Sequence, residues 1–143
     1  MHFSCLHLHK PPVNSFLTVG APAPLQAAGA VGLAFDPDYF NHLALDYRAR
    51  RHVLVEALNE AGFSFAVPEG AYYILADFSA LSDLDDVTFA KWMTQEIGVA
   101  TVPGSSFYHD REMGRSLVRF AFCKKFDTLR RAAERLVEVR QKV

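Results

Sequence analysis

The order of helical and strand-like patterns predicts an α/β fold, a two-layer sandwich in which a small sheet is covered by helices on one face. Helical patterns in residues 36–143 alternate with pairs of short apolar runs typical of strands. The chain has 143 residues, the size of one domain. Half of the residues are hydrophobic and the formal net charge is −1, so we expect a globular, core-rich protein.

Residues 1–12 differ from the rest and are expected to form an N-terminal arm. Four of them carry side chains that bind metals, namely His2, Cys5, His7 and His9. Structural zinc sites normally use two spaced pairs of ligands, and these residues lack that spacing. We therefore expect a loose terminal segment and no metal site.

Two helices are expected next. Pro24 can open a helix that extends to Leu33, although two glycines weaken it. A stronger helix begins at Asp36, where the carboxylate caps and Pro37 occupies the first turn, and it ends at Gly62. Apolar residues recur along it at helical spacing: Phe40, Leu43, Ala44, Tyr47, Leu54 and Leu58.

The middle of the chain predicts two strands. Residues 63–67 alternate between apolar and small side chains, and residues 72–77 form a nearly continuous apolar run. Pro68, Glu69 and Gly70 between them are typical of a turn.

The second half predicts two further helices. Residues 82–86 offer several caps for a helix that carries Phe89, Trp92, Met93 and Ile97 and ends at Gly98. Asp83, Asp85 and Asp86 are interpreted as helix-start residues rather than a cation site. Residues 99–102 form a short strand. Asp127 caps the last helix, whose inward residues are Leu129, Ala133, Leu136 and Val137.

Arg119 lies in an otherwise apolar strand that spans residues 116–123. Strand alternation places Val118, Phe120 and Phe122 on one face, which the helices should cover, and Arg119 on the other. A permanently charged guanidinium needs an anionic partner there. That partner is either a carboxylate of this chain or a ligand carboxylate held by two parallel hydrogen bonds.

The polar loop 103–116 is long enough to suggest a functional role. Its first residues combine a fixed dihedral at Pro103, a permissive one at Gly104 and short polar side chains. This turn either brings backbone close to a ligand or is an ordinary strand exit. Ser105, Ser106 and His109 are too close in sequence to predict a nucleophile with its base.

Several functional classes are not indicated. The phosphate-binding patterns G-x-G-x-x-G and Walker A and the G-x-S-x-G elbow do not occur. Basic residues are spread along the chain, so we expect no nucleic-acid binding. There is no apolar run of bilayer length and no signal-peptide pattern. Cys5 and Cys123 lie far apart, which favours the cytoplasm.

Five blocks in order resemble the C-terminal small domain of class I/II pyridoxal-phosphate-dependent aminotransferases, the fold type I family. They are Thr18 to Gln26, Pro68 to Asp77, Phe89 to Gly98, Gly98 to Phe107, and Gly114 with Val118 to Phe122. Residues 1–12 have no counterpart in this resemblance. It covers residues 14–140 and implies transfer of an amino group between an amino acid and a 2-oxo acid.

The resemblance implies a substrate-binding role for Arg119, which would hold the substrate α-carboxylate. It places an active-site mouth at Gly70, Tyr72, Pro103, Gly104, Ser105 and Phe107. It also divides the chain into residues 1–12, an inter-domain segment 13–35 that packs on a large domain, and the small domain 36–143.

The family's Schiff-base lysine block and its phosphate-binding residues do not occur in this sequence. The resemblance therefore implies no catalytic residue here, no bound pyridoxal phosphate and no activity of this chain alone. Two alternatives stay open: a non-catalytic binding or regulatory module, and part of another fold type I enzyme such as a lyase, racemase or decarboxylase. Because segment 13–35 is apolar, we also expect self-association.

Overall fold

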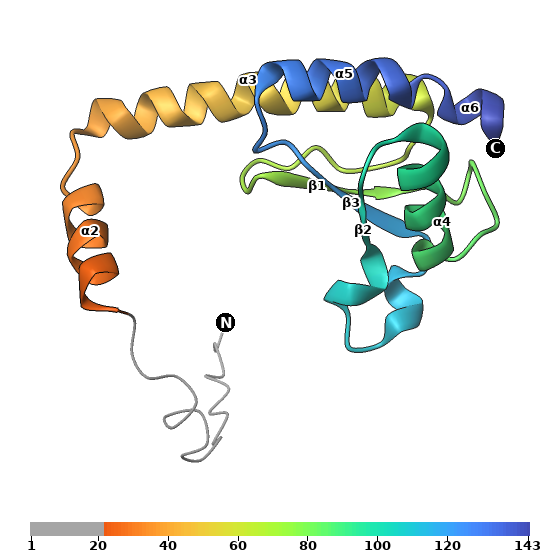
Figure 1. Cartoon of the computed structure of the whole chain (residues 1–143), viewed down its shortest axis with the longest axis horizontal. Helices are drawn as coiled ribbons and strands as arrows, with labels where there is room; N and C mark the ends of the chain where they lie inside the picture. The colour runs from red at the N-terminus through yellow and green to blue at the C-terminus, as the bar shows by residue number, and fades with distance from the viewer. Residues whose placement is uncertain (1–21) are drawn as a thin grey trace, which may run out of the picture. The chain divides into compact units, whose positions relative to one another are not determined.

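A computed structural model of the protein describes residues 22–143, so the metal-ligand hypothesis on residues 1–12 lies outside the described part. The chain divides into two compact units, Met1–Phe40 and Asn41–Val143. The described part of the first unit contains helix α2 (Ala23–Leu33) and the start of helix α3 (Pro37–Ala61) (Figure 1). All other described elements belong to the second unit.

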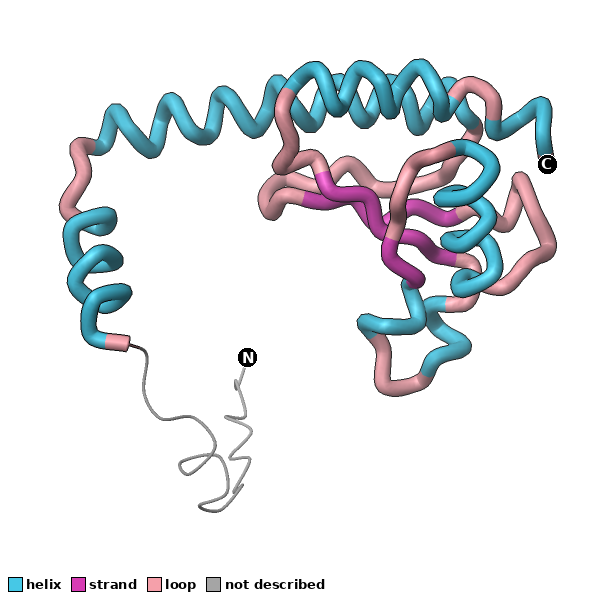
Figure 2. The backbone as a smooth tube through the Cα atoms, viewed as in Figure 1, coloured by secondary structure: helices cyan, strands magenta, loops and turns pink. Residues whose placement is uncertain are grey.

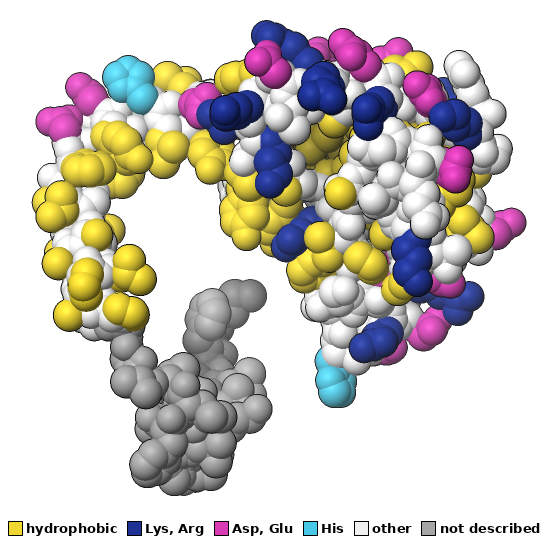
Figure 3. Space-filling view, viewed as in Figure 1, with side chains coloured by type: hydrophobic (Ala, Val, Ile, Leu, Met, Phe, Trp, Pro, Cys, Tyr) yellow, Lys and Arg dark blue, Asp and Glu magenta, His cyan; other side chains and the backbone are white. Residues whose placement is uncertain are grey.

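Helix α2 confirms the helix predicted from Pro24. Pro22 precedes it and Pro24 lies in its first turn, where a missing backbone N–H costs nothing. None of its residues is buried, and Leu25 and Leu33 are 66% and 84% exposed. Hydrophobic side chains cover much of the visible surface of this helix (Figure 3). The helix therefore exposes an apolar surface.

Helix α3 begins and ends where the sequence predicts. A carboxylate oxygen of Asp36 accepts a hydrogen bond from the Asp38 backbone N–H at 2.9 Å, and Gly62 follows the helix at φ +90°. Only the second half of the predicted apolar stripe is buried. The buried residues of this helix are Leu54, Ala57, Leu58 and Ala61.

The second unit is built on a three-stranded antiparallel sheet (Figure 2). Strand β3 (Leu117–Ala121) lies between β1 (Tyr73–Asp77) and β2 (Val102–Pro103). Burial alternates along β1 and β3, because successive side chains point to opposite faces. The buried face of β3 carries Val118 and Phe120, as predicted.

Helices cover this buried face, which confirms the predicted two-layer α/β arrangement. Helix α4 (Asp86–Trp92) continues as a π-helical turn (Met93–Ile97), and α5 (Phe126–Leu136) and α6 (Val139–Lys142) end the chain. Side chains from α3, α4, α5 and α6 join those of the strands in one core. Within it the Phe78 and Phe89 rings stack with centroids 3.9 Å apart. Burying each such ring stabilises the fold by roughly 1.5–3 kcal/mol.

The strand predicted at residues 63–67 is wrong. Only Ser64 pairs with β1, through two backbone hydrogen bonds with Asp77. Beyond Ser64 the backbone leaves the edge of the sheet. The carbonyl of Pro68 instead accepts a hydrogen bond from the Arg51 guanidinium.

Three smaller predictions also need correction. The strand expected at residues 99–102 is limited to Val102 and Pro103. Helix α5 begins one residue before Asp127, which lies in the first turn and does not cap it. Val137 is 39% exposed, because the helix ends at Leu136 and the chain changes direction before α6. Val139 is buried in its place.

Candidate functional site

Arg119 occupies the centre of β3, with Leu75 of β1 and Val102 of β2 as its register partners. It is half-buried and shares its face with Leu117 and Ala121, opposite the helix-covered face. The predicted orientation of Arg119 is therefore confirmed. Because its strand is paired on both sides, the backbone of this residue is held by the sheet.

Two aromatic rings contact the Arg119 guanidinium. Its central carbon lies 4.6 Å from the centroid of the Phe107 ring and 5.2 Å from that of the Tyr73 ring. A cation–π contact places the cation over the face of an aromatic ring and uses none of the guanidinium N–H groups as donors to an acceptor atom. The rings therefore orient the charge without neutralising it.

The hydrogen-bonding capacity of Arg119 is not used within the described part of the chain. None of the ion pairs among residues 22–143 includes it. Its Nε is buried and has no hydrogen-bond partner there. A buried charged donor without a partner is costly, so this arrangement favours an external anion over a structural salt bridge.

The turn that carries Phe107 starts at the sheet edge. Pro103 pairs with Val118, and residues Gly104–Phe107 then form a short 3₁₀ helix. The backbone N–H of Ser105 donates a 2.7 Å hydrogen bond to a carboxylate oxygen of Asp86, the buried first residue of α4. Pro103, Gly104, Ser105 and Phe107 thus lie in one turn, and the last of these residues, Phe107, contacts Arg119.

Gly104 contacts the backbone of a second 3₁₀ helix, Arg111–Gly114. A Cβ added at Gly104 would lie 2.6 Å from the Gly114 carbonyl oxygen, and one at Gly114 would lie 2.4 Å from the Ser105 nitrogen. A Cβ atom essentially never lies this close to an atom to which it is not bonded, so both positions need glycine. The contact between Gly104 and Gly114 therefore holds the two ends of the predicted polar loop together.

The predicted mouth residues Gly70 and Tyr72 are not brought into direct contact with Arg119 by any hydrogen bond or ring contact of residues 22–143. The Tyr72 ring packs edge-on against Tyr73 at 5.4 Å. Gly70 lines a separate hollow of about 210 Å³. Between them Ala71 adopts φ +62°, which costs a residue with a Cβ about 1–2 kcal/mol.

Sequence reasoning missed two residues of this site. Tyr73 belongs to the segment Pro68 to Tyr73 that the resemblance places beside the substrate, but it was not named as a mouth residue, although its position two residues before Leu75 places it on the Arg119 face. Asp86 was interpreted as one of several helix-start carboxylates. Asp85 is the residue that caps α4, by accepting from the Thr88 backbone N–H at 2.8 Å, which leaves Asp86 to bind the turn. No local pattern distinguishes the two.

A polar cluster stands at the end of β1. Asp77 accepts hydrogen bonds from the hydroxyls of Ser116 and Ser79 and from the Ser79 backbone N–H. Burial acts to raise the pKa of the Asp77 carboxyl, but the hydrogen bonds from Ser116 and Ser79 together outweigh it and hold the pKa below its ordinary value. The carboxylate thus joins β1 to the start of β3.

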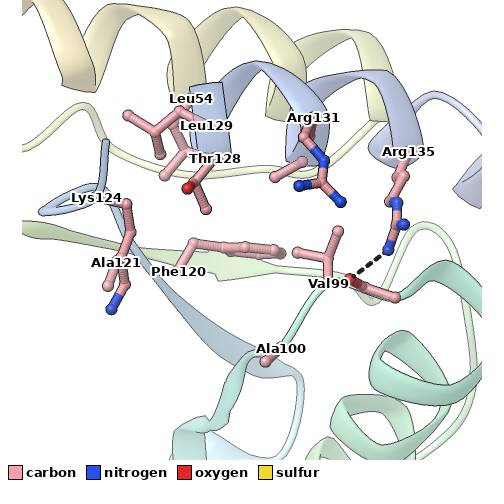
Figure 4. A pocket seen from close by; sticks show the side chains of 12 residues that line it. Leu54, Val99, Ala100, Phe120, Ala121, Lys124, Thr128, Leu129, Arg131 and Arg135 are labelled. Carbon is pink, nitrogen blue, oxygen red and sulfur yellow. Dashed lines mark hydrogen bonds between the residues drawn. The ribbon is translucent and has the colours of Figure 1, made fainter. Parts of the chain in front are cut away.

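A cleft of about 310 Å³ lies on the other side of the sheet (Figure 4). Phe120 and Leu129 form part of its apolar wall, and the Arg131 side chain extends over it from α5. Arg135 donates a 3.0 Å hydrogen bond to the Gly98 carbonyl at one end. None of the predicted site residues lines this cleft, so it is distinct from the Arg119 site.

Residues 22–143 contain no group of three or more metal-binding side chains, and no helix among them is both long and apolar enough to cross a bilayer. No hydrogen bond joins His109 to Ser105 or Ser106 within this part of the chain. These observations add no second candidate centre to the Arg119 site.

A sequence model of the family described as aminotransferase class I and II matches residues 3–136. The chain belongs to this family. It is 44% identical over 124 residues to the methionine aminotransferase of Escherichia coli (strain K12), covering 87% of this chain and 32% of that protein. It is 31% identical over 148 residues to a kynurenine–oxoglutarate transaminase of Dictyostelium discoideum, covering 90% of this chain and 34% of that protein.

Solved structures agree with this membership. The structure of YbdL from Escherichia coli, described as a methionine aminotransferase, matches with TM-score 0.74 and 44% identity over 88% of this chain and 33% of that one. The N-succinyldiaminopimelate aminotransferase of Mycobacterium tuberculosis matches with TM-score 0.76 and 34% identity over 87% and 33%. The chain spans about a third of the length of the curated relatives that it matches.

The family implies pyridoxal phosphate as cofactor of its full-length members. That cofactor is held through a lysine amine in a pocket that positions and tunes it. The described lysines are all exposed: Lys91, Lys124, Lys125 and Lys142. Lys142 is also paired with Glu138. Residues 22–143 therefore do not provide a site that fits the cofactor.

Proposed function

We propose that this chain is the substrate-carboxylate-binding part of a pyridoxal-phosphate-dependent aminotransferase, an enzyme that moves an amino group between an amino acid and a 2-oxo acid. One observation carries the proposal. Arg119 presents a guanidinium that lies over the rings of Phe107 and Tyr73 and whose Nε is buried without a partner in the described residues.

The geometry suits a carboxylate better than other anions of similar size. A guanidinium offers parallel N–H donors in one plane, and these match the two oxygens of a carboxylate. The rings of Phe107 and Tyr73 restrict the plane in which the guanidinium can bind. Arg119 would therefore hold the α-carboxylate common to amino acids and 2-oxo acids.

The mouth of the site would be formed by Pro103, Gly104, Ser105 and Phe107, together with Gly70 and Tyr72. Phe107 supports this assignment because it is 46% exposed while it contacts Arg119. The relatives are named for methionine, kynurenine and N-succinyldiaminopimelate. Their side chains differ widely, so we leave the amino donor open and propose only the α-carboxylate as the shared element.

We further propose that this chain has no transaminase activity by itself. The described residues offer no lysine in a pocket, and the chain spans about a third of its relatives. Segment 13–35 would pack against the part of an aminotransferase that these relatives have in addition. The exposed apolar surface of α2 supports this, because such a surface normally has a partner.

The proposal is tested by titrating pyruvate, the simplest apolar 2-oxo acid, into the chain at constant ionic strength. Nuclear magnetic resonance follows the backbone amide signals of Phe107 and Val118, which every variant retains. We expect a saturable shift in the wild type. Arg119→Lys keeps the charge but loses the planar pair of donors. Because a hydrogen bond to a charged group contributes about 1.5–3 kcal/mol, affinity should fall roughly ten- to a hundredfold.

Arg131→Lys is the matched control, since Arg131 is an exposed arginine beside the separate cleft. It should bind pyruvate as the wild type does. Equal weakening by both substitutions would indicate general electrostatic attraction and would contradict the proposal. Unchanged binding in Arg119→Lys would contradict it as well.

A further inference from the structure

Asp86 is a buried carboxylate that the helix does not use as its cap. It is 4% exposed, although aspartate is rarely buried without a partner. The cap of α4 is its neighbour Asp85, which accepts hydrogen bonds from both the backbone N–H and the hydroxyl of Thr88. The hydrogen bond found for Asp86 is the one from Ser105, nineteen positions away.

The Ser105 hydrogen bond lies within the turn that presents Phe107. Pro103 fixes the start of this turn to β3, and Gly104 rests against Gly114. These two contacts hold the base of the turn. The 2.7 Å bond from the Ser105 N–H to Asp86 is the next attachment along the chain toward Phe107. Bonds that involve an ionised acceptor are short and about twice as strong as neutral ones.

We infer that Asp86 is a positioning residue for the Arg119 site: its carboxylate fixes the Gly104–Phe107 turn so that the Phe107 ring stays on the face of the Arg119 guanidinium. This inference rests on the proposed function of Arg119. Asp86 does not contact Arg119, so it acts through Ser105 and Phe107. Loss of the carboxylate would release the turn, and Arg119 would lose the ring that orients its donors.

The test uses the ring-current shift of the Arg119 side-chain signals in the chain without ligand. Three variants are compared: Asp86→Ala, Asp86→Asn and Asp85→Ala. Asp86→Ala should abolish the Phe107 contribution to the shift and raise Ser105 amide exchange to the rate of an unprotected amide. Asp86→Asn keeps an oxygen acceptor of the same shape and should restore both signals in large part.

Asp85→Ala is the matched control because it weakens the same helix start without touching the turn. It should lower the melting temperature and leave the Arg119 shift and Ser105 protection as in the wild type. An equal loss of the shift in Asp85→Ala would show that only helix stability matters, which would overturn the inference. An unchanged shift in Asp86→Ala would overturn it too.

The wild type supplies a second measurement that needs no variant. If Asp86→Ala does not fold, the exchange rate of the Ser105 amide decides: a protected amide supports the inference, and an unprotected one overturns it. These signals are read without ligand. A failed pyruvate titration would therefore contradict the proposed function while leaving the coupling of Asp86 to Phe107 measurable.

Discussion

Arg119 and Arg50 each contact two aromatic rings and each have a buried Nε without a hydrogen-bond partner in the described residues, but they differ in their other partners. Arg50, for comparison, pairs with Asp46 at 2.8 Å and donates to the Lys124 carbonyl. Arg119 contacts only aromatic faces among the interactions of the described residues. A residue kept for stability normally satisfies its donors within the protein. The effect of an Arg119 substitution on the free energy of unfolding therefore distinguishes a structural role from a ligand-binding role.

Replacing Arg119 with Met should cost little stability. Each lost cation–π contact lowers stability by about 0.5–1 kcal/mol at an exposed site. The substitution also removes a buried Nε that has no partner, which partly offsets this loss. We expect the free energy of unfolding in urea to fall by roughly 1 kcal/mol or less. Phe120→Ala, on the adjacent buried position, should cost about 3–5 kcal/mol. A loss of similar size for Arg119→Met would indicate a structural role.

The residue-scale features that sequence could predict were those set by alternation. The orientation of Arg119 follows from the two-residue period of a strand. Alternation does not give the partners of Arg119: Phe107 was expected near it only through the family resemblance, because it lies in a turn that contacts Asp86 and Gly114. Local propensity contains no information on such contacts.

At the scale of elements, the helices were predicted better than the strands. Caps and glycine stops defined α3 and the end of the π-helical turn at Gly98, which has φ +74°. The strand predicted at 63–67 failed although its side chains alternate, because a strand also needs a partner for its backbone. Ser64 has that partner in Asp77, and the residues after it do not.

The hydrogen bonds of Asp77 join β1 to the start of β3. Because they depend on the ionised carboxylate, we expect the link between these two strands to weaken in acid. The folded-state pKa of Asp77 is lowered from its ordinary value, so folding favours the ionised form of this carboxyl. The contribution of ionised Asp77 to the free energy of unfolding is present at pH values above its unfolded-state pKa. This contribution is lost as the pH falls through the lower folded-state pKa. We expect Asp77→Asn to lose stability at neutral pH and to show a shallower acid limb, measured by urea unfolding across that range.

Exposed Asp127, in the first turn of α5, provides the control for this prediction. Asp127→Asn should leave the acid limb close to that of the wild type. If Asp77→Asn unfolds with the same pH dependence as the wild type below neutrality, the cluster does not couple its ionisation to folding.

At the scale of the whole molecule, the chain combines a completed core with an uncovered helix. The second unit buries side chains from four helices and from strands β1 and β3 in one cluster. Helix α2 buries none of its residues. The two-layer fold was predictable because its periodic patterns lie within residues 36–143. The partner of α2 was not, because an apolar helix surface does not specify what covers it.

We expect the chain to self-associate through α2. Leu25, Val31 and Leu33 are 66%, 61% and 84% exposed, and burying apolar area of this kind is favourable at about 25 cal/mol per Å². Sedimentation equilibrium should show a concentration-dependent mass. Replacing the three residues with Ser should shift the chain toward monomer while the second unit keeps its melting temperature. A wild type that stays monomeric at high concentration would contradict this.

The contact between Gly104 and Gly114 has a consequence for how the family could diversify. This contact holds together the two ends of the loop between Gly104 and Gly114. Phe107 and Met113 in this loop are exposed. Closing a loop costs only about 0.6 kcal/mol more for each doubling of its length. Insertions, deletions and substitutions at residues 108–113 can therefore accumulate without disturbing β3 or the contact between Phe107 and Arg119. Under the proposed function, such changes would alter which substrate side chains enter, while Arg119 would continue to bind their common carboxylate.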